Sequence, residues 1–148
     1  MPAWCQYVDM VCVYCGSPTQ VVNSRAQRRG NGVWRRRRCT VCAHVFTTEE
    51  HPDLSQSFMV EDTHGALSPF QRDKLFISLY EACKHREDAL QAATSLTETI
   101  MGKVLKKRLR GSIAAPELAR TAYAVLHAFD RTAATVYSAY HPTTSHKR

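Results

Sequence analysis

The sequence predicts an α+β protein, in which a small module of short antiparallel strands is followed by a mainly helical domain with a short strand pair. Two Cys-x-x-Cys pairs bracket a strand-prone, turn-containing segment between residues 12 and 42. From about residue 70 onward, apolar residues recur at the three- and four-residue spacing of helices. The 148 residues suffice for one small module plus one modest domain.

The two cysteine pairs predict one structural zinc ion per chain. Two thiolates three positions apart chelate one ion from a tight turn, and two such turns complete a tetrahedron without an open position. A closed site of this kind does not support metal catalysis. His44 is an alternative fourth ligand, and Cys5 is either a spare thiol or an alternative ligand. The expected ligands are Cys12, Cys15, Cys39 and Cys42.

Residues 12–48 are expected to form three short strands around the cysteine turns. The first includes 19–22, a turn follows at 30–32, and the second carries four consecutive arginines into the second cysteine pair. Side chains alternate along a strand, so Arg35 and Arg37 should lie on one face and Arg36 and Arg38 on the other. At most half of them can then contact one flat surface.

Positive charge is concentrated in this module. Residues 11–48 contain seven arginines and no Lys, Asp or Glu, whereas residues 49–148 contain 13 basic and 12 acidic side chains. This distribution predicts a polyanionic partner, most simply double-stranded DNA. Trp34 either stacks on a base or packs in the small core. The predicted DNA-binding residues are Arg25, Arg28, Arg29, Arg35, Arg36, Arg37 and Arg38.

The chain organisation follows from these patterns. We expect a leader at 1–11, the DNA-binding module at 12–50, a linker at 51–55, a helical domain at 56–141 and a disordered polar tail at 142–148. No secretory signal and no membrane-spanning apolar run is visible, so we expect a cytoplasmic protein with reduced thiols.

The second domain should open with a strand at 56–60 and a turn at 61–65, before four helices. The first helix should start with Ser68 as N-cap and Pro69 at its first position. The second should run over 88–109, the third should start at Pro116, and Asp130 should cap the fourth. The expected inward side chains are Leu75, Phe76, Leu79, Tyr80, Cys83, Ile100, Met101, Val104, Leu105, Leu118, Ala122, Val125, Leu126, Phe129, Ala133, Val136, Tyr137 and Tyr140.

Four cations end the second helix: Lys106, Lys107, Arg108 and Arg110. They either complement the negative helix terminus or form a second nucleic-acid contact. No catalytic motif is found: HExxH, Gly-x-Ser-x-Gly, a P-loop and GxGxxG are all missing from the sequence. We therefore do not expect an enzyme.

These motifs, in this order, resemble the zinc ribbon of the NrdR transcriptional repressors. The residues that carry the resemblance are Cys12–Cys15, Val21–Arg25, Trp34–Cys42 and Val45–Glu49. In those repressors an ATP-cone follows the ribbon, and Pro69–Leu75 is similar to its Pro-Phe-x-x-x-Lys-Leu signature. Residues 82–86 and 129–133 also have counterparts there. The resemblance covers about residues 12–141.

The resemblance implies repression of ribonucleotide reductase genes at a DNA operator. It also implies that bound ATP or dATP sets the state of a homo-oligomer. Carried over by position, nucleotide-binding roles fall on Val60, Phe70 and Lys74, with Lys74 at the phosphates.

Glu61 and Asp62 stand where the family has phosphate-binding cations. Two alternatives to nucleotide sensing therefore remain. In one, the cone-like domain only oligomerises and binds no nucleotide. In the other, the chain is an enzyme fragment or a regulatory piece of a reductase, since the resemblance implies an ATP-cone and ATP-cones also occur there.

Overall fold

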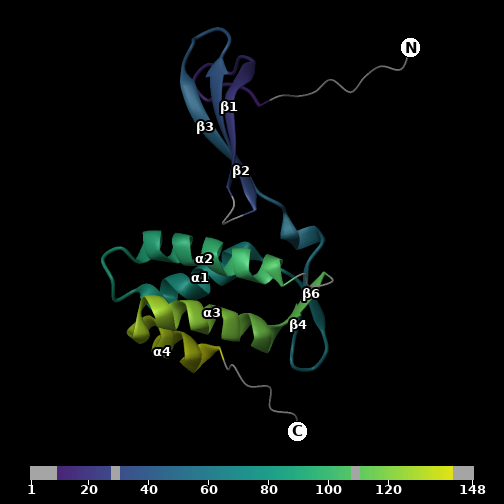
Figure 1. Cartoon of the computed structure of the whole chain (residues 1–148), viewed down its shortest axis with the longest axis vertical. Helices are drawn as coiled ribbons and strands as arrows, with labels where there is room; N and C mark the ends of the chain where they lie inside the picture. Colours follow the sequence, from purple (N-terminus) through teal and green to yellow (C-terminus); the bar gives the residue numbers. More distant parts are fainter. Residues whose placement is uncertain (1–9, 28–30, 108–110, 142–148) are drawn as a thin grey trace, which may run out of the picture. The chain divides into compact units, whose positions relative to one another are not determined.

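In a computed structural model, the chain divides into two compact units, Met1–Pro52 and Asp53–Arg148 (Figure 1). The structure describes residues 10–27, 31–107 and 111–141. The first unit is built of antiparallel strands, and the second consists of four helices with a small mixed sheet. The predicted α+β class is confirmed. The described helices include none that is both long and apolar enough to cross a membrane.

The first unit contains one three-stranded antiparallel sheet in the order β1-β2-β3. Its strands are β1 (Thr19–Gln27), β2 (Gly32–Cys39) and β3 (Val45–Glu50). The first strand is longer than the predicted segment 19–22. A bulge between Val21 and Asn23 shifts its register by one residue against β2. Because the bulge re-phases the strand, different β1 residues share a face with the arginines on its two sides.

The second unit has a three-stranded sheet in the order β5-β4-β6. Strands β4 (Met59–Glu61) and β5 (Leu67–Pro69) pair antiparallel, and β6 (Ser112–Ala114) lies parallel to β4. The strand pair was predicted, but β6 was not, because three residues are too few to show alternation. The predicted strand at 56–60 starts too early, because β4 begins at Met59 and Gln56 instead ends a short 3-10 helix over Leu54–Gln56. The Asp53 carboxylate caps that helix by accepting from the N–H of Ser55.

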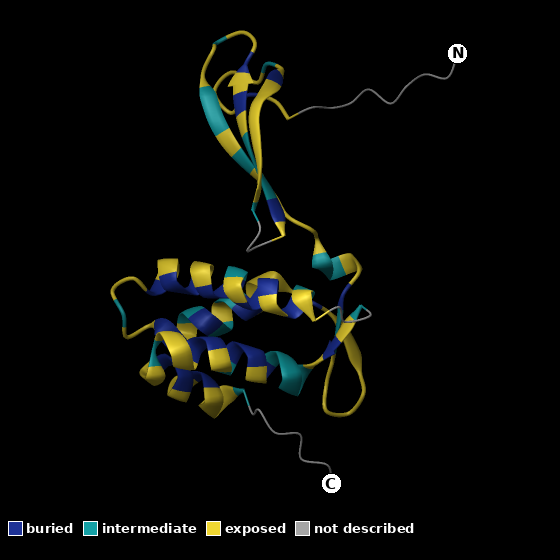
Figure 2. Ribbon diagram, in the orientation of Figure 1, coloured by how far each residue is buried: buried dark blue, intermediate teal, exposed yellow. Residues whose placement is uncertain are grey.

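Four helices pack around one apolar core. They are α1 (Arg72–Cys83), α2 (Ala89–Lys106), α3 (Ala115–Phe129) and α4 (Arg131–Tyr140). Helix α1 packs against α2 and α4, and α3 packs against the same two helices. Each helix buries one face and exposes the other (Figure 2). The side chains at the centre of this core include Leu79, Thr97, Ile100, Val104 and Leu126.

The predicted start of the first helix is wrong. Ser68 and Pro69 lie in β5, and α1 begins three residues later at Arg72 with Gln71 at its N-cap. The backbone N–H of Phe70 donates to the carbonyl of Phe58 at 2.8 Å, which continues the β4–β5 pairing. Because Ser68 and Pro69 pair with β4, they are not available to form the start of the helix.

At the other end of the unit, the Asp130 cap is confirmed, since its carboxylate accepts from the N–H of Ala133. Three residues expected to face inward are exposed: Phe129, Val136 and Tyr140, the last at 79%. Phe129 instead lies under the guanidinium of Arg86, 4.8 Å from the ring centre.

Candidate metal centre, arginine face and helical-unit cavity

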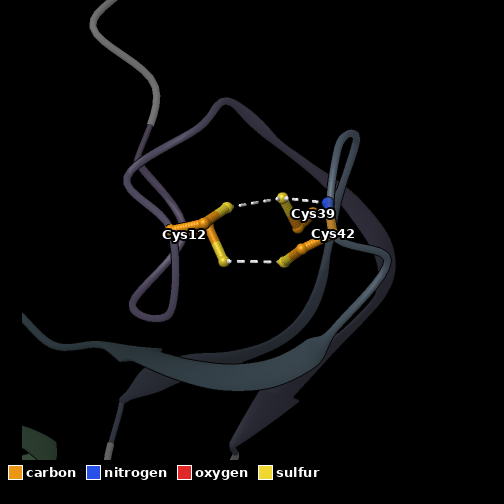
Figure 3. Close-up of side chains that lie close together, drawn as sticks. Cys12, Cys39 and Cys42 are labelled. Carbon is orange, nitrogen blue, oxygen red and sulfur yellow. Dashed lines mark hydrogen bonds between the residues drawn. The ribbon is translucent and has the colours of Figure 1, made fainter.

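The four thiols predicted as ligands meet at one point of the first unit. Figure 3 labels three of these residues, Cys12, Cys39 and Cys42. All four Sγ atoms lie within 4.8 Å of one another. The Sγ atoms of Cys12 and Cys42 are 3.6 Å apart, and those of Cys15 and Cys39 are 3.5 Å apart. Ligands at about 2.3 Å from a tetrahedral zinc are separated by about 3.8 Å. The cluster therefore has the dimensions of a four-thiolate zinc site, and its sulfurs are too far apart for disulfides.

Each cysteine pair is held by a similar backbone turn. Backbone N–H groups point at sulfur, from Val41 and Cys42 to Cys39 at 3.3 Å and from Tyr14 to Cys12 at 3.4 Å. Such donors stabilise thiolates. The residue after each pair, Gly16 or Ala43, has positive φ, at 71° and 60°. This left-handed residue turns the chain away from the metal position.

The thiols do not all ionise equally well without a cation. Hydrogen bonds with Ser17, led by its side chain, lower the pKa of Cys15 to about 6. At Cys42 the backbone N–H of His44 favours the thiolate, but burial and the other three thiols outweigh it and raise the pKa to about 12. Four clustered thiolates repel one another, and a divalent ion at their centre removes that repulsion.

His44 is not part of the thiol cluster. Its ring packs against Tyr14, with centroids 4.6 Å apart, while the cluster consists of the four cysteines. Cys5 lies outside the described residues. Cys83 is buried in the core of the second unit, where burial raises the pKa of its thiol, consistent with a packed and unreactive side chain.

The arginine run of β2 is divided between the two faces of the sheet. Arg36 and Arg38 are exposed, whereas Arg37 is buried at 6% exposure. Antiparallel partners share a face, and Arg25 pairs with Trp34, two positions before Arg36. Exposed Arg25, Arg36 and Arg38 therefore lie on one face, which we call the arginine face.

The two other arginines of the run contact the protein itself. The Nη1 atom of Arg37 lies 3.3 Å from the hydroxyl oxygen of Thr19. Arg35 forms an ion pair with Glu50 at 3.0 Å. Both are less available to a ligand than Arg36 and Arg38. Trp34 is half-buried, and Arg28 and Arg29 lie outside the described residues.

A cavity of about 300 Å³ in the second unit brings together the three residues carried over for nucleotide binding. Val60 comes from β4, Phe70 follows β5, and Lys74 lies in the first turn of α1. Leu118 of α3 and Tyr137 of α4 complete the apolar wall. Lys74 is the only Lys or Arg among the described residues that line this cavity.

The residues of this cavity that were not predicted to line a site include Tyr137 and His141. Tyr137 was expected only as a core residue, and it is buried. His141 stacks on it, with ring centroids 4.4 Å apart. Burial, followed by the charge of Lys74, lowers the pKa of His141. Nothing in the sequence marks His141, because it reaches the cavity only through the end of α4.

Glu61 and Asp62 do not line this cavity. The Asp62 carboxylate accepts hydrogen bonds from the N–H groups of His64 and Ala66, at 2.7 and 2.9 Å. The bond from Ala66, followed by that from His64, lowers the pKa of Asp62. The carboxylate thus builds the turn between β4 and β5. Neither acid lies among the side chains that would meet a ligand in the cavity.

Comparison with known proteins finds a family model that matches the first unit. Residues 10–50 match the family model described as the N-terminal domain of NrdR-like transcriptional repressors, a zinc ribbon. Together with the thiol geometry, this match confirms the prediction of one structural Zn²⁺ in this unit.

Three relatives illustrate the wider similarity, each named transcriptional repressor NrdR. The protein from Aromatoleum aromaticum is 39% identical over 97 residues, 65% of this chain and 56% of the relative. That from Thermus thermophilus is 44% identical over 78 residues, 52% of this chain and 50% of the relative. That from Corynebacterium diphtheriae is 33% identical over 104 residues, 70% of this chain and 64% of the relative.

The chain thus spans between 50% and 64% of the length of these curated relatives. The resemblance to the NrdR-type repressors that the motifs indicated is confirmed.

Proposed function

We propose that this chain, with its NrdR-like zinc ribbon, is a DNA-binding transcriptional repressor and not an enzyme. Residues 12–50 bind the operator, and residues 56–141 bind ATP or dATP and set the state of a homo-oligomer in the cytoplasm. The regulated genes, by resemblance, are those of ribonucleotide reductase. The observation that carries the proposal is the arginine face, which a closed thiol site holds in place. The relatives' shared name, transcriptional repressor, supports the same conclusion.

The arginine face suits a phosphate backbone for two reasons. Guanidinium groups bind phosphate oxygens through paired hydrogen bonds. Arg36 and Arg38 are exposed and alternate on one strand, so their Cα atoms are about 6.6 Å apart at the rise of a strand. That distance is close to the spacing of successive phosphates on one DNA strand. Arg25 on β1 extends the same face.

Salt-dependent binding to duplex DNA tests this role. We would measure the affinity of the zinc-loaded chain for a mixed-sequence duplex between 50 and 200 mM salt, and expect a steep loss as counterions compete. Arg36→Ala/Arg38→Ala should weaken binding and lower the slope of log K against log[salt] by about 2. Arg35→Ala is the matched control, because Arg35 lies on the other face and is paired with Glu50. An unchanged slope in the double variant would remove the arginine face from the interface.

The cavity of the second unit supports nucleotide binding. Its walls combine aromatic and apolar side chains, which suit a base, with one lysine, which suits a phosphate. The acids that had argued against a triphosphate are outside this lining. However, Lys74 provides a single permanent positive charge. One positive charge is little for a triphosphate, which supports a second candidate function. In it, the chain is a zinc-ribbon repressor whose helical unit oligomerises without nucleotide.

Two measurements separate these candidates. The purified chain is denatured and its supernatant analysed by chromatography for adenine nucleotides, and dATP is added to the nucleotide-free chain in a thermal-shift assay. We expect bound adenine nucleotide and a raised unfolding temperature, both reduced by Lys74→Gln. Lys84→Gln is the control, because Lys84 caps the C-terminal end of the same helix, is paired with Glu81 and does not line the cavity. If neither bound nucleotide nor a thermal shift is found, the second candidate function remains, in which the helical unit only oligomerises. Sedimentation analysis then tests that function.

A further inference from the structure

A second group of cations lies in the helical unit, away from the cavity described above. A groove of about 400 Å³ runs between α2 and α3. Lys103 lies in α2, Lys107 is the C-cap residue of that helix, and Arg120 lies in α3. Glu117 is the only acid among the described residues that line it, so the groove carries an excess of positive charge. We call these residues the α2–α3 groove.

One of the cations is held in place by the protein. The Lys107 ammonium lies 2.9 Å from a carboxylate oxygen of Glu117 and 3.0 Å from the hydroxyl of Thr121. That hydroxyl donates to the backbone carbonyl of Glu117. These contacts hold Lys107 in one orientation. They also engage Glu117, the acid that lines the groove, in an ion pair with Lys107.

The two other cations have no such partner. Among the described residues, neither Lys103 nor Arg120 forms an ion pair, whereas Arg72, Lys84 and Arg86 of the same unit all do. Lys103 and Lys107 are four residues apart on one helix face, a spacing at which like charges repel. An anion bound between the helices would relieve this repulsion.

The favourable interaction of cations with the negative C-terminal end of α2 explains only part of the positive charge in the groove. Lys103 and Lys106 lie in the last turns of that helix, where cations are favourable. Arg120 belongs to another helix, where it lies in the second turn, outside the first and last turns in which the helix ends favour one sign of charge. Its placement beside the two lysines is therefore not accounted for by the helix ends.

We propose that the α2–α3 groove binds phosphate groups through Lys103, Lys107 and Arg120. The shared chemistry is that of a phosphodiester backbone or a free polyphosphate, both of which present closely spaced anionic oxygens to ammonium and guanidinium groups. The groove lies outside the arginine face and the nucleotide cavity, so it adds a third contact to those proposed above. Its phosphate affinity does not depend on either of them.

The test uses the full zinc-loaded chain and the double variant Lys103→Gln/Arg120→Gln. Arg131→Gln with Lys106→Gln is the matched control, because it removes the same charge from exposed positions of this unit that do not line the groove. In the first arm, sodium pyrophosphate is titrated at constant ionic strength while amide NMR signals are followed. We expect saturable shifts at residues 103, 107, 120 and 121 in the wild type and the control, and their loss in the groove variant.

In the second arm, salt-dependent binding to a mixed-sequence duplex is compared. A slope lower by about 2 in the groove variant but not in the control identifies the DNA backbone as the source of the phosphates. Pyrophosphate shifts at the groove with unchanged DNA binding identify a free polyphosphate. If pyrophosphate gives no saturable shifts and the DNA slopes of groove and control variants agree, the proposal is wrong. The pyrophosphate arm stands even if the wild type binds no DNA, which would refute the proposed repressor instead.

Discussion

Gly16 and Ala43 occupy equivalent positions, one residue after each cysteine pair, and both have left-handed backbone. A side chain is disfavoured there because its Cβ approaches the carbonyl oxygen. Glycine avoids this cost, so the first turn is relaxed and the second, with alanine, is strained. A Cβ at Gly16 would have no heavy atom within 4 Å. The two positions therefore isolate the backbone contribution to the zinc site.

Reciprocal substitutions should have opposite effects at these positions. Ala43→Gly should stabilise the metal-bound ribbon by about 1 kcal/mol, and Gly16→Ala should destabilise it by a similar amount. Each change corresponds to about fivefold in zinc affinity, measured by competition with a chromophoric chelator. Ala3→Gly, in the leader, is a control for handling effects. If both substitutions weaken zinc binding, left-handed strain at residue 43 is not what limits the turn.

At the scale of elements, Asp130 joins three segments of the helical unit. Its carboxylate caps α4 through the N–H of Ala133 at 3.0 Å. It also contacts His85 and Arg86, both at 3.1 Å, from the loop between α1 and α2. The bond from Ala133, followed by those from His85 and Arg86, lowers the pKa of Asp130. One side chain thus fixes the start of α4 against the end of α1.

Asp130→Ala should lower the unfolding temperature of the helical unit by about 5 °C, the size expected for loss of one helix cap. The folded-state pKa of Asp130 lies below its unfolded value of about 3.9, so the stabilisation is present above that pH and is lost as the pH falls through the folded value. Thermal unfolding followed by circular dichroism at several pH values should show the two proteins converging in acid. Asp130→Asn, which keeps a capping oxygen without the charge, should fall between them. A difference that does not change with pH would mean that the ionised carboxylate contributes nothing.

The structural features that the sequence predicted correctly are those that local chemistry decides. The cysteine spacing predicted the thiol cluster, alternation predicted the division of the arginines, and Asp130 was found from its capping position. Each of these features is marked by a short local pattern: a Cys-x-x-Cys pair, an alternating run on one strand, or a single capping residue. Turn chemistry at Ala43 was not predictable, because alanine gives no signal for a left-handed backbone.

Sequence-based prediction fails where pairing with residues far away in the chain overrides a local preference. Ser68 and Pro69 have the pattern of a helix start, yet they pair with β4. Strand β6 exists only because Met59–Glu61 pairs with it from some fifty residues away. The cavity of the helical unit shows the same limit. Val60, Phe70 and Lys74 were named from motifs, whereas His141 joins them only through the packing of α4.

At the scale of the whole molecule, the two units are stabilised by different means. Among the described residues of the first unit few apolar side chains are buried, and its four clustered thiols form the site that would hold it together. Residues 53–148 contain the apolar core, whose members all belong to that unit. A module of about 40 residues with little core of its own depends on its metal for folding. The helical unit has no such dependence.

Chelation should therefore unfold one unit and leave the other intact. Both tryptophans, Trp4 and Trp34, lie in the first unit, so tryptophan fluorescence reports on the ribbon, whereas circular dichroism at 222 nm reports mainly on α1–α4. Removing zinc should change the fluorescence and abolish DNA binding, while the helical signal and its unfolding temperature stay the same. Cys42→Ser should reproduce this without chelator, and Cys83→Ala, which removes a thiol outside the cluster, should keep one zinc per chain. A metal-free chain with unchanged tryptophan fluorescence would show that the thiol site is not what holds the ribbon together. Loss of the helical signal together with the zinc would show that the two units do not fold independently.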